Sequence, residues 1–480
     1  MDGIPFATAT YIRRRTSLRR ALGSGLLLFL GNADSDINYA GNAYPFRQDS
    51  NFLYFFGLDM PGLAAVIDID NDCETVFGDG TTLDDIVWTG PVPALEELAA
   101  AAGIRRVEPC RNLGPYLQRT ARGRRVQFLL PYRSEHRLQL MSLLGIAPGA
   151  QDAGVSEAFA RAVVNLRSHK TEEEVASLDE AVDLSVRMHL EACRLAQPGG
   201  RESDIAAAVD AVAARENCLT SFPTIATVQG QILHNHSYSH TLRAGDLLLL
   251  DAGAESAAHY AGDLSTTMPV GGEWTPRQKD ICDLQLAMFR AAVETLAIGV
   301  PFLDVHLAAA QRLCEGLRGL GLMQGDPAEA AVSGAYRLFF PHGVGHMLGL
   351  DVHDMDNLGE DLVGYAPGQQ RSPLPGLSSL RLARPLEPGF VFTIEPGIYF
   401  IPELIDRWQA DRRCADFIRY DRLDDWRGFT GLRSEQDYLM TAAGARRLGR
   451  LAKPMTADEI SRACLSPAPE NVFTPKTSEI

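Results

Sequence analysis

The chain has 480 residues, an apolar content of 46% and a formal net charge of −16 at pH 7. This length predicts roughly two or three domains, and the negative charge argues against nucleic acid or an anionic membrane as a partner. The eight cysteines are scattered without a C-x-x-C pair, and no apolar run reaches the roughly 18 residues that cross a bilayer, so we expect reduced thiols in a cytoplasmic protein without a membrane span.

The N-terminal segment has the charge order of a secretory signal. Residues 13–20 are basic and residues 21–30 are apolar, but no small-residue cleavage pattern of the A-x-A type follows them. We therefore expect a basic helix followed by a buried first strand with the sequence LLLFLG.

The first third of the chain alternates strand-like and helix-like segments. The runs AAVIDID (64–70) and VQFLLPY (126–132) predict strands, and ALEELAAAAG (94–103) predicts a helix between them. This alternation is typical of an α/β domain, which we place at residues 1–168.

The remainder of the chain shows a faint internal repeat. A long helix begins after Thr171, which has Glu174 at capping-box spacing, and a second long helix begins after Thr275, which has Gln278 at the same spacing. A shorter helix and glycine-rich strands are predicted after each of them. Residues 169–480 are therefore expected to form a duplicated helix-helix-strand domain of the α+β class, with a site between its halves.

Several common catalytic motifs are absent from the sequence. It contains no H-E-x-x-H, no G-x-S-x-G and no glycine-lysine pair of a P-loop. Thermolysin-like proteases, α/β-hydrolases and P-loop NTPases are therefore excluded.

Acids and histidines end or interrupt strand-like runs in the second domain, where polar residues are otherwise costly. Asp251 follows four leucines, and Asp263 comes twelve residues later, so we expect the two to lie opposite each other on an antiparallel hairpin with a turn at 254–259. The two glycines of HGVGH (342–346) favour a loop over a zinc-binding helix. The remaining members of the set are His342, His346, His353, Glu395 and Glu435.

Five of these side chains suit a two-metal site: Asp251, Asp263, His346, Glu395 and Glu435. Their four carboxylates would be neutralised by two divalent cations. Carboxylate-rich ligation with one imidazole favours manganese, with cobalt, iron or zinc as alternatives. Two such cations roughly 3.5–4 Å apart share one water and make it a nucleophile. The competing interpretation is structural, because an aspartate at a strand end is commonly a turn former or a helix cap, and spacing alone leaves both interpretations open.

The five segments, in this order, resemble the pita-bread metallopeptidases of the aminopeptidase P, prolidase and methionine aminopeptidase group. The resemblance covers about residues 170–450 and rests above all on PHGVGHMLGLDVHD (341–354) and EPGIYF (395–400). The segment YPFRQDSNFLYFFGLDMPG (44–62) also resembles the N-terminal domain of aminopeptidase P and prolidase. Together they imply an α/β N-terminal domain, a pita-bread catalytic domain and proline-containing peptides as substrates.

The resemblance implies a role for each candidate ligand. Asp251 is expected to bind one metal with both oxygens, and Asp263 and Glu435 to bridge the two metals. His346 and Glu395 are expected to complete the second metal, and Glu395 also to relay a proton to the leaving nitrogen.

The resemblance also implies a set of residues around the metals. His353 is expected to steady the scissile carbonyl or its oxyanion, and His342 and His234 to line the substrate pocket as catalytic or binding residues. Tyr399 is expected to contact substrate, and Arg433 to orient the cluster acids. A surface strand charge is the alternative for Arg433.

The chain departs from the family pattern in three places. The family has a step of eleven residues between its two aspartates, and the step of twelve here predicts one extra residue in the turn or a bulge. Residues 264–267 read LSTT where the family often has threonine-arginine-threonine. Insertions at about 355–380 and 401–430 resemble those of eukaryotic-type prolidases. They imply that Arg381 grips the carboxylate of a dipeptide, with a solvated loop arginine as the alternative.

The first hypothesis is a Xaa-Pro aminopeptidase, narrowly ahead of a Xaa-Pro dipeptidase. A metal-free binding relative is the alternative from a different class. The resemblance further implies a homodimer or homotetramer. Trp88 could reach the site of a neighbouring copy, but we expect it to be a buried core residue.

Overall fold

The computed structural model describes residues 3–374 and 377–466 of the chain. Two compact units are present: Met1–His169 together with Met355–Val363, and Lys170–Asp354 together with Gly364–Ile480. The first break follows His169, and the short segment from Met355 to Val363 groups with the first unit. Pro375 and Gly376, part of the first predicted insertion, lie outside the described residues.

The first unit is built on one five-stranded mixed sheet with the strand order β4-β3-β2-β1-β5. The strand LLLFL has four buried residues and lies next to the edge, pairing antiparallel with β2 and parallel with β5. Such continuous apolar runs are typical of strands that are covered on both faces. The strands are β1 (Leu26–Leu30), β2 (Ala64–Asp68), β3 (Cys73–Phe77), β4 (Val107–Glu108) and β5 (Val126–Gln127).

The predicted basic helix is observed as α1, the first helix of this unit. Asp49 caps the N-terminus of helix α2, where its carboxylate accepts hydrogen bonds from the backbone N–H groups of Asn51 and Phe52 at 2.9 Å, and every residue of α2 is buried. The helices are α1 (Thr8–Leu22), α2 (Ser50–Phe56), α3 (Leu83–Thr89), α4 (Leu95–Ala101), α5 (Leu113–Ala121), α6 (Ser134–Leu144), α7 (Gln151–Gly154) and α8 (Glu157–Ser168).

The prediction of a buried Trp88 is wrong. Trp88 lies on α3 and is 80% exposed. A capping box between Thr82 and Asp85 starts this short helix, and none of its residues is buried. Local capping thus forms the helix, while its apolar side chains Leu83, Val87 and Trp88 face outward.

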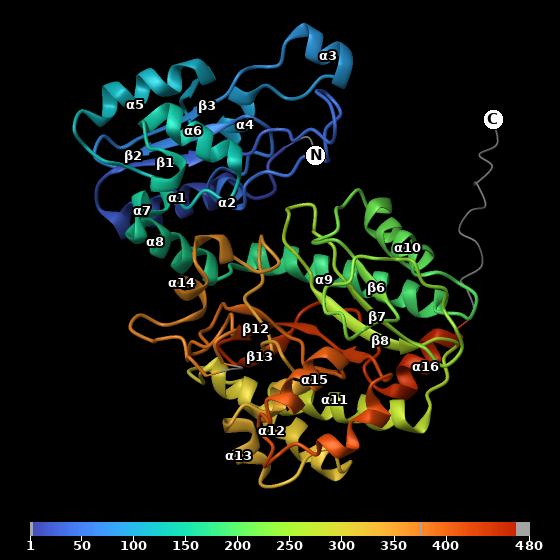
Figure 1. Cartoon of the computed structure of the whole chain (residues 1–480). Coiled ribbons are helices and arrows are strands. Elements are labelled where there is room, and N and C mark those ends of the chain that lie inside the picture. The colour runs from blue at the N-terminus through green and yellow to red at the C-terminus, as the bar shows by residue number, and fades with distance from the viewer. Residues whose placement is uncertain (1–2, 375–376, 467–480) are drawn as a thin grey trace, which may run out of the picture. The chain divides into compact units, whose positions relative to one another are not determined.

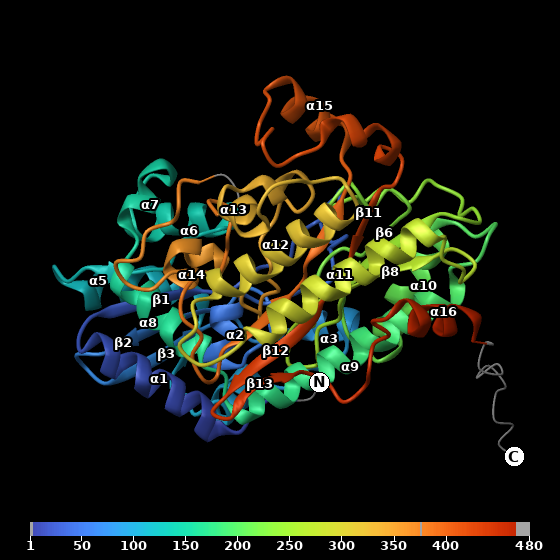
Figure 2. The ribbon, with the colours of Figure 1, turned by 90° about the horizontal axis from the view of Figure 1, so that it is seen from below.

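The second unit contains the two predicted helix pairs, of which α11 and α12 run side by side in Figure 2. Both predicted capping boxes are present, at Thr171 with Glu174 and at Thr275 with Gln278. The helices of this unit are α9 (Glu172–Leu195), α10 (Glu202–Arg215), α11 (Pro276–Glu294), α12 (Phe302–Gly319), α13 (Pro327–Val332), α15 (Pro402–Ala410) and α16 (Ala457–Leu465). Helix α14 (Glu360–Gly364) begins in the segment that groups with the first unit and ends at the first residue of the second. None of the helices within residues 3–374 and 377–466 combines the length and apolarity that a bilayer crossing requires.

Antiparallel strands follow each helix pair, so the helix-helix-strand duplication is confirmed (Figure 1). The first half contributes the sheet β6-β7-β8, and the second half contributes the sheet β13-β12-β9 and the pair β10-β11. The strands are β6 (Ile225–Thr227), β7 (Leu247–Ala252), β8 (Leu264–Pro269), β9 (Val391–Ile394), β10 (Gly397–Tyr399), β11 (Gly431–Arg433), β12 (Gln436–Thr441) and β13 (Gly444–Arg447).

Hydrogen bonds join the strands of the two halves. The backbone N–H of Arg433 donates to the hydroxyl of Thr267 at 3.0 Å, and the N–H of Glu435 donates to the carbonyl of Ser265 at 3.1 Å. Strand β8 of the first half therefore lies against the β11–β12 segment of the second half. This contact brings the acids of both halves to one place.

Candidate metal centre

The hairpin β7–β8 presents Asp251 and Asp263 on the same face, but not directly opposite each other. Asp251 pairs with Ser265, and Asp263 lies two residues before Ser265. Side chains two residues apart on a strand share a face, so the acids are diagonal neighbours. The prediction of direct pairing is wrong, because the shorter turn shifts the register by two residues.

The extra residue between the two acids lies in the turn. The register of β7 and β8 continues without a bulge to the bridge between Glu255 and Ala261, and the N–H of Ser256 donates to the carbonyl of Tyr260 at 2.8 Å. His259 occupies the left-handed region with φ 64°, which closes the turn. The twelve-residue step is therefore accommodated without displacing either acid from the strand pattern.

The other three candidate ligands come from the second half. His346 lies in the predicted loop, where its carbonyl accepts the N–H of Thr393 on β9 at 3.0 Å. Glu395 directly follows β9, and Glu435 lies between β11 and β12. Ligand atoms of Asp263, His346 and Glu435 all lie within 4.8 Å of one another, a spacing that suits a metal ion.

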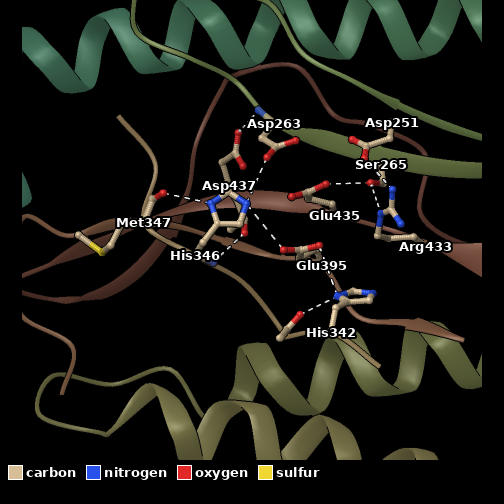
Figure 3. Close-up of polar contacts among 12 residues, drawn as sticks. Asp251, Asp263, Ser265, His342, His346, Met347, Glu395, Arg433, Glu435 and Asp437 are labelled. Carbon is tan, nitrogen blue, oxygen red and sulfur yellow. Dashed lines mark hydrogen bonds and ion pairs between the residues drawn. The ribbon is translucent and has the colours of Figure 1, made fainter. Parts of the chain in front are cut away.

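His346 is oriented for a ligand on its second nitrogen. Its Nδ1 donates to the carbonyl of Met347 at 3.0 Å, so Nε2 keeps its lone pair. Nε2 lies 3.3 Å from Oδ2 of Asp263 and 3.7 Å from Oε1 of Glu395. Figure 3 shows the imidazole pointing between these two carboxylates.

Arg433 connects the acids on the opposite side of the cluster. Its guanidinium donates to Oδ2 of Asp251 at 2.6 Å, to the hydroxyl of Ser265 at 2.9 Å and to the hydroxyl of Tyr399 at 2.9 Å. The Ser265 hydroxyl in turn donates to Glu435 at 2.8 Å (Figure 3). Two cluster acids, one from each half, are thereby fixed by one planar cation.

Burial sets the electrostatics of the cluster. It raises the pKa of Asp263 to about 8, with the charge of Asp251 adding to the shift, and it raises the pKa of Glu395 to about 7. The pKa of Glu435 lies well above its ordinary range for the same reason. Such carboxylates favour a protonated state unless cations lie beside them.

The residues present fit divalent cations. The buried Oδ1 atom of Asp251 accepts no hydrogen bond from the described residues, and the carboxylates outnumber the single guanidinium beside them. Oxygen ligands with one imidazole are the donors that Mn²⁺ and related ions prefer. Asp251, Asp263, His346, Glu395 and Glu435 could therefore hold a two-metal centre, and their role as ligands stays a prediction.

A cavity of about 620 Å³ opens onto the cluster. One part of its wall is apolar and includes Phe222, Ile225 and Leu233. The predicted site residues His234, His342, His353, Arg381 and Arg433 all line it together with the five candidate ligands. The ring of His353 lies 4.2 Å from the ring of His346, measured between centroids.

Tyr399 lies behind the cavity wall instead of at its surface. It is fully buried and is not among the described residues that line the cavity. Its hydroxyl accepts from Arg433 and lies 2.9 Å from Nε2 of His342. Nδ1 of His342 donates to the carbonyl of Gly343 at 2.8 Å, so Nε2 accepts from Tyr399 and both ring nitrogens are engaged. Burial lowers the pKa of His342 to about 3, which keeps the ring neutral.

Two supporting residues were missed by sequence reasoning. Ser265 links Arg433 to Glu435, and Asp437 accepts the backbone N–H of Asp263 at 3.0 Å. Each lies two residues after a predicted acid, so the period of two along a strand places it on the same face. That spacing is the signal that could have identified them.

Comparisons with known proteins agree with this architecture. Residues 176–442 match metallopeptidase family M24, and residues 11–129 match the aminopeptidase P N-terminal domain. The chain is 29% identical to human Xaa-Pro dipeptidase, over 98% of this chain and 96% of the relative, and 27% identical to the Xaa-Pro aminopeptidase of Escherichia coli strain K12, over 91% and 93%. The solved structure of Pseudomonas aeruginosa aminopeptidase PepP is similar with a TM-score of 0.79 and 26% identity, covering 97% of this chain and 99% of that one.

Proposed function

Because this chain belongs to metallopeptidase family M24 and has the aminopeptidase P type of N-terminal domain, we propose that it hydrolyses the Xaa-Pro bond at the N-terminus of peptides. The observation that carries the proposal is the set of five candidate ligands converging on one cavity. The preferred cofactor is a pair of Mn²⁺ ions, with Co²⁺, Fe²⁺ or Zn²⁺ as alternatives. Two bound cations would polarise the scissile carbonyl and lower the pKa of a water molecule.

The residues of this chain supply the remaining functions. Glu395 lies at the cavity, and a pKa of about 7 suits a group that takes a proton and passes it to the leaving nitrogen near neutral pH. His353 lines the cavity and would donate to the carbonyl oxygen as negative charge develops on it. The apolar wall at Phe222, Ile225 and Leu233 suits the apolar parts of the substrate.

Aminopeptidase activity on longer peptides is the first candidate, and dipeptidase activity is the second. Both kinds of enzyme occur among the similar proteins. The position of Arg381 in the cavity wall favours the second candidate, since a guanidinium pairs well with the C-terminal carboxylate of a dipeptide. Variant Arg381→Met is expected to raise KM for Xaa-Pro dipeptides more than for tripeptides if this contact forms.

The decisive test compares peptide lengths and metals. The purified chain is stripped with a chelator, reloaded with Mn²⁺ and assayed on an Xaa-Pro dipeptide and on an Xaa-Pro-Xaa tripeptide. Release of the first residue from the tripeptide supports aminopeptidase activity, whereas cleavage of the dipeptide alone replaces it with dipeptidase activity. If the chain binds no divalent metal and cleaves neither peptide, the hypothesis of a metal-dependent exopeptidase is refuted. The alternative of a metal-free binding protein then remains.

Replacement of Glu395 tests the proton-transfer role. Variant Glu395→Gln is expected to lower kcat by about 10²-fold or more, because the amide cannot carry the proton. Glu403→Gln, at the exposed start of α15, is the matched control with unchanged activity. Turnover of Glu395→Gln at the level of this control would rule out the assigned role.

A further inference from the structure

The loop from 228 to 240 brings three residues to the cavity without regular secondary structure of its own. Leu233, His234 and His236 from this loop line the cavity. It follows strand β6 and ends beside the start of helix α10, where Arg201 and Thr241 form a bridge. A loop that positions side chains at a site needs contacts that restrict its backbone.

Glu202, the first residue of α10, joins the two ends of this loop. Its side chain is fully buried. Its Oε1 accepts from the N–H of Val228 at 2.8 Å and from the hydroxyl of Thr227 at 3.1 Å. Its Oε2 accepts from the N–H of His240 at 2.9 Å and from Nδ1 of the same residue at 2.9 Å. One carboxylate thus receives donors from both sides of the loop.

The hydroxyl of Thr227 extends this contact to the middle of the loop. The hydroxyl of Thr227 donates its proton to Glu202. Its oxygen therefore acts as the acceptor for Nδ2 of Asn235 at 2.9 Å and for the N–H of Gln229 at 3.0 Å. Asn235 is buried and lies between the two cavity histidines, His234 and His236, in sequence. A continuous series of hydrogen bonds therefore runs from Glu202 to the residue that separates them.

The charge of Glu202 makes these bonds strong. Burial raises the pKa of Glu202, but the hydrogen bonds from His240 and Val228 outweigh that effect and leave the pKa below its ordinary value. Hydrogen bonds to a buried charged acceptor contribute more than neutral ones. A glutamine at this position cannot accept with both ends, since its amide nitrogen only donates.

We propose that Glu202 is a positioning residue, which through Thr227 and Asn235 sets the place of His234 and His236 in the cavity wall. The kinetic part of this inference rests on the proposed peptide hydrolysis. Glu202 lies in the first half of the catalytic unit and touches none of the five candidate ligands through its described hydrogen bonds. Its loss is therefore expected to change substrate binding and to leave bound metal unchanged.

The test compares Glu202→Gln with Asp204→Asn in the full chain. Asp204 is exposed on the same helix turn and accepts the N–H of Arg201 at 3.1 Å, so its replacement weakens the start of α10 without touching the loop. Hydrogen exchange followed by mass spectrometry is expected to be about tenfold faster for amides 228–240 in Glu202→Gln than in the control. With Mn²⁺ and an Xaa-Pro peptide, KM is expected to rise about tenfold with kcat and bound metal little changed.

Two variants of Thr227 test the connection if Glu202→Gln folds poorly. Thr227→Val removes the hydroxyl and is expected to reproduce the faster exchange and the higher KM, whereas Thr227→Ser keeps the hydroxyl and is expected to restore both. Exchange in the loop that matches Asp204→Asn in both Glu202→Gln and Thr227→Val would overturn the inference. Because hydrogen exchange needs no substrate, it decides the matter even for a chain that cleaves no Xaa-Pro bond, which would refute only the proposed function.

Discussion

The candidate metal centre concentrates four acids around a single buried guanidinium. Ordinary protein interiors avoid this arrangement, since each unpaired buried carboxylate costs on the order of several kcal/mol. That cost is a large share of the free energy of unfolding of a typical protein. The raised pKa values of Asp263 and Glu395, together with the unpartnered oxygen of Asp251, mark the cost in this chain. Bound cations would offset it, which explains why such a cluster signals function more than stability.

Arg433 is the residue whose shape matters most for the order of this cluster. Its three bonds, to Asp251, Ser265 and Tyr399, use the fork of a planar guanidinium. Variant Arg433→Lys keeps the charge but cannot reach all three partners, so kcat/KM on an Xaa-Pro peptide is expected to fall about 10–100-fold. Arg446→Lys is the matched control, because Arg446 pairs with Asp179 at 3.0 Å on the surface. Equal kcat/KM in the two variants would contradict the orienting role.

The identities of the acids could be predicted from sequence, because a carboxylate at the end of a buried apolar strand is costly unless it is paired or binds a metal. Asp251 and Glu395 stand out for this reason. Ser265 and Asp437 do not, since a serine or a second acid in a strand is compatible with many structural roles. The exposure of Trp88 was also hidden, because the burial of an apolar side chain depends on which distant elements cover it and not on its neighbours in sequence.

At the scale of elements, the loop that carries His346 and His353 is held by a buried ion pair. Nζ of Lys170, just before α9, lies 2.8 Å from Oδ2 of Asp354, and both side chains are 1% exposed. The N–H of Asp354 donates to the carbonyl of Met347 at 2.9 Å, which folds the loop back on itself. A Cβ on Gly349 would lie 2.4 Å from a carboxylate oxygen of Asp354, so this close approach requires glycine.

Removal of one member of this pair is expected to be strongly destabilising. Lys170→Met leaves the buried carboxylate of Asp354 without its ammonium partner, and the free energy of unfolding should fall by about 3–5 kcal/mol. Lys279→Met is the control, because Lys279 forms exposed pairs with Asp283 and Asp458, each at 3.7 Å, and its replacement should cost less than about 1 kcal/mol. Urea unfolding curves at fixed metal concentration provide the comparison. Equal midpoints for the two variants would refute the claim that the pair of Lys170 and Asp354 stabilises the fold.

The start and type of these elements could be predicted, but their register could not. Capping boxes at Thr171 and Thr275 are local signals, and both mark helix starts in the structure. The pairing of Asp251 with Ser265 depends on how many residues the turn takes up, which is set by the tight conformation at residues 256–260. A two-residue shift keeps the acids on the same face, so their closeness could be predicted from sequence even though their pairing could not.

At the scale of the whole catalytic unit, neither half carries the site alone. Asp251 and Asp263 come from the first half, whereas His346, Glu395 and Glu435 come from the second. The faint repeat in the sequence predicted this division, since two similar halves create a shared centre where they meet. Each half also buries a neutral histidine on a long helix, His189 on α9 and His306 on α12.

These histidines make the fold sensitive to acid. Burial lowers the pKa of His189 and of His306 to about 3, compared with about 6.5 for an exposed imidazole. The folded state therefore binds fewer protons than the unfolded chain below pH 6.5. The stability associated with the neutral rings is fully present above pH 6.5 and is lost as the pH falls toward 3, with each ring accounting for about 2 kcal/mol between pH 7 and pH 5.

His306 offers the clearer test, since it lies away from the candidate ligands and its Nε2 is 2.7 Å from the hydroxyl of Tyr336. His306→Phe should remove the part of the acid-induced loss of stability that this imidazole causes. The difference in the free energy of unfolding between pH 7 and pH 5 should therefore shrink by about 2 kcal/mol. Tyr336→Phe removes the same hydrogen bond but keeps the imidazole, and it should retain the full pH dependence. Parallel urea titrations at the two pH values measure both variants. If His306→Phe shows the same pH dependence as Tyr336→Phe, the acid loss does not arise from this buried ring.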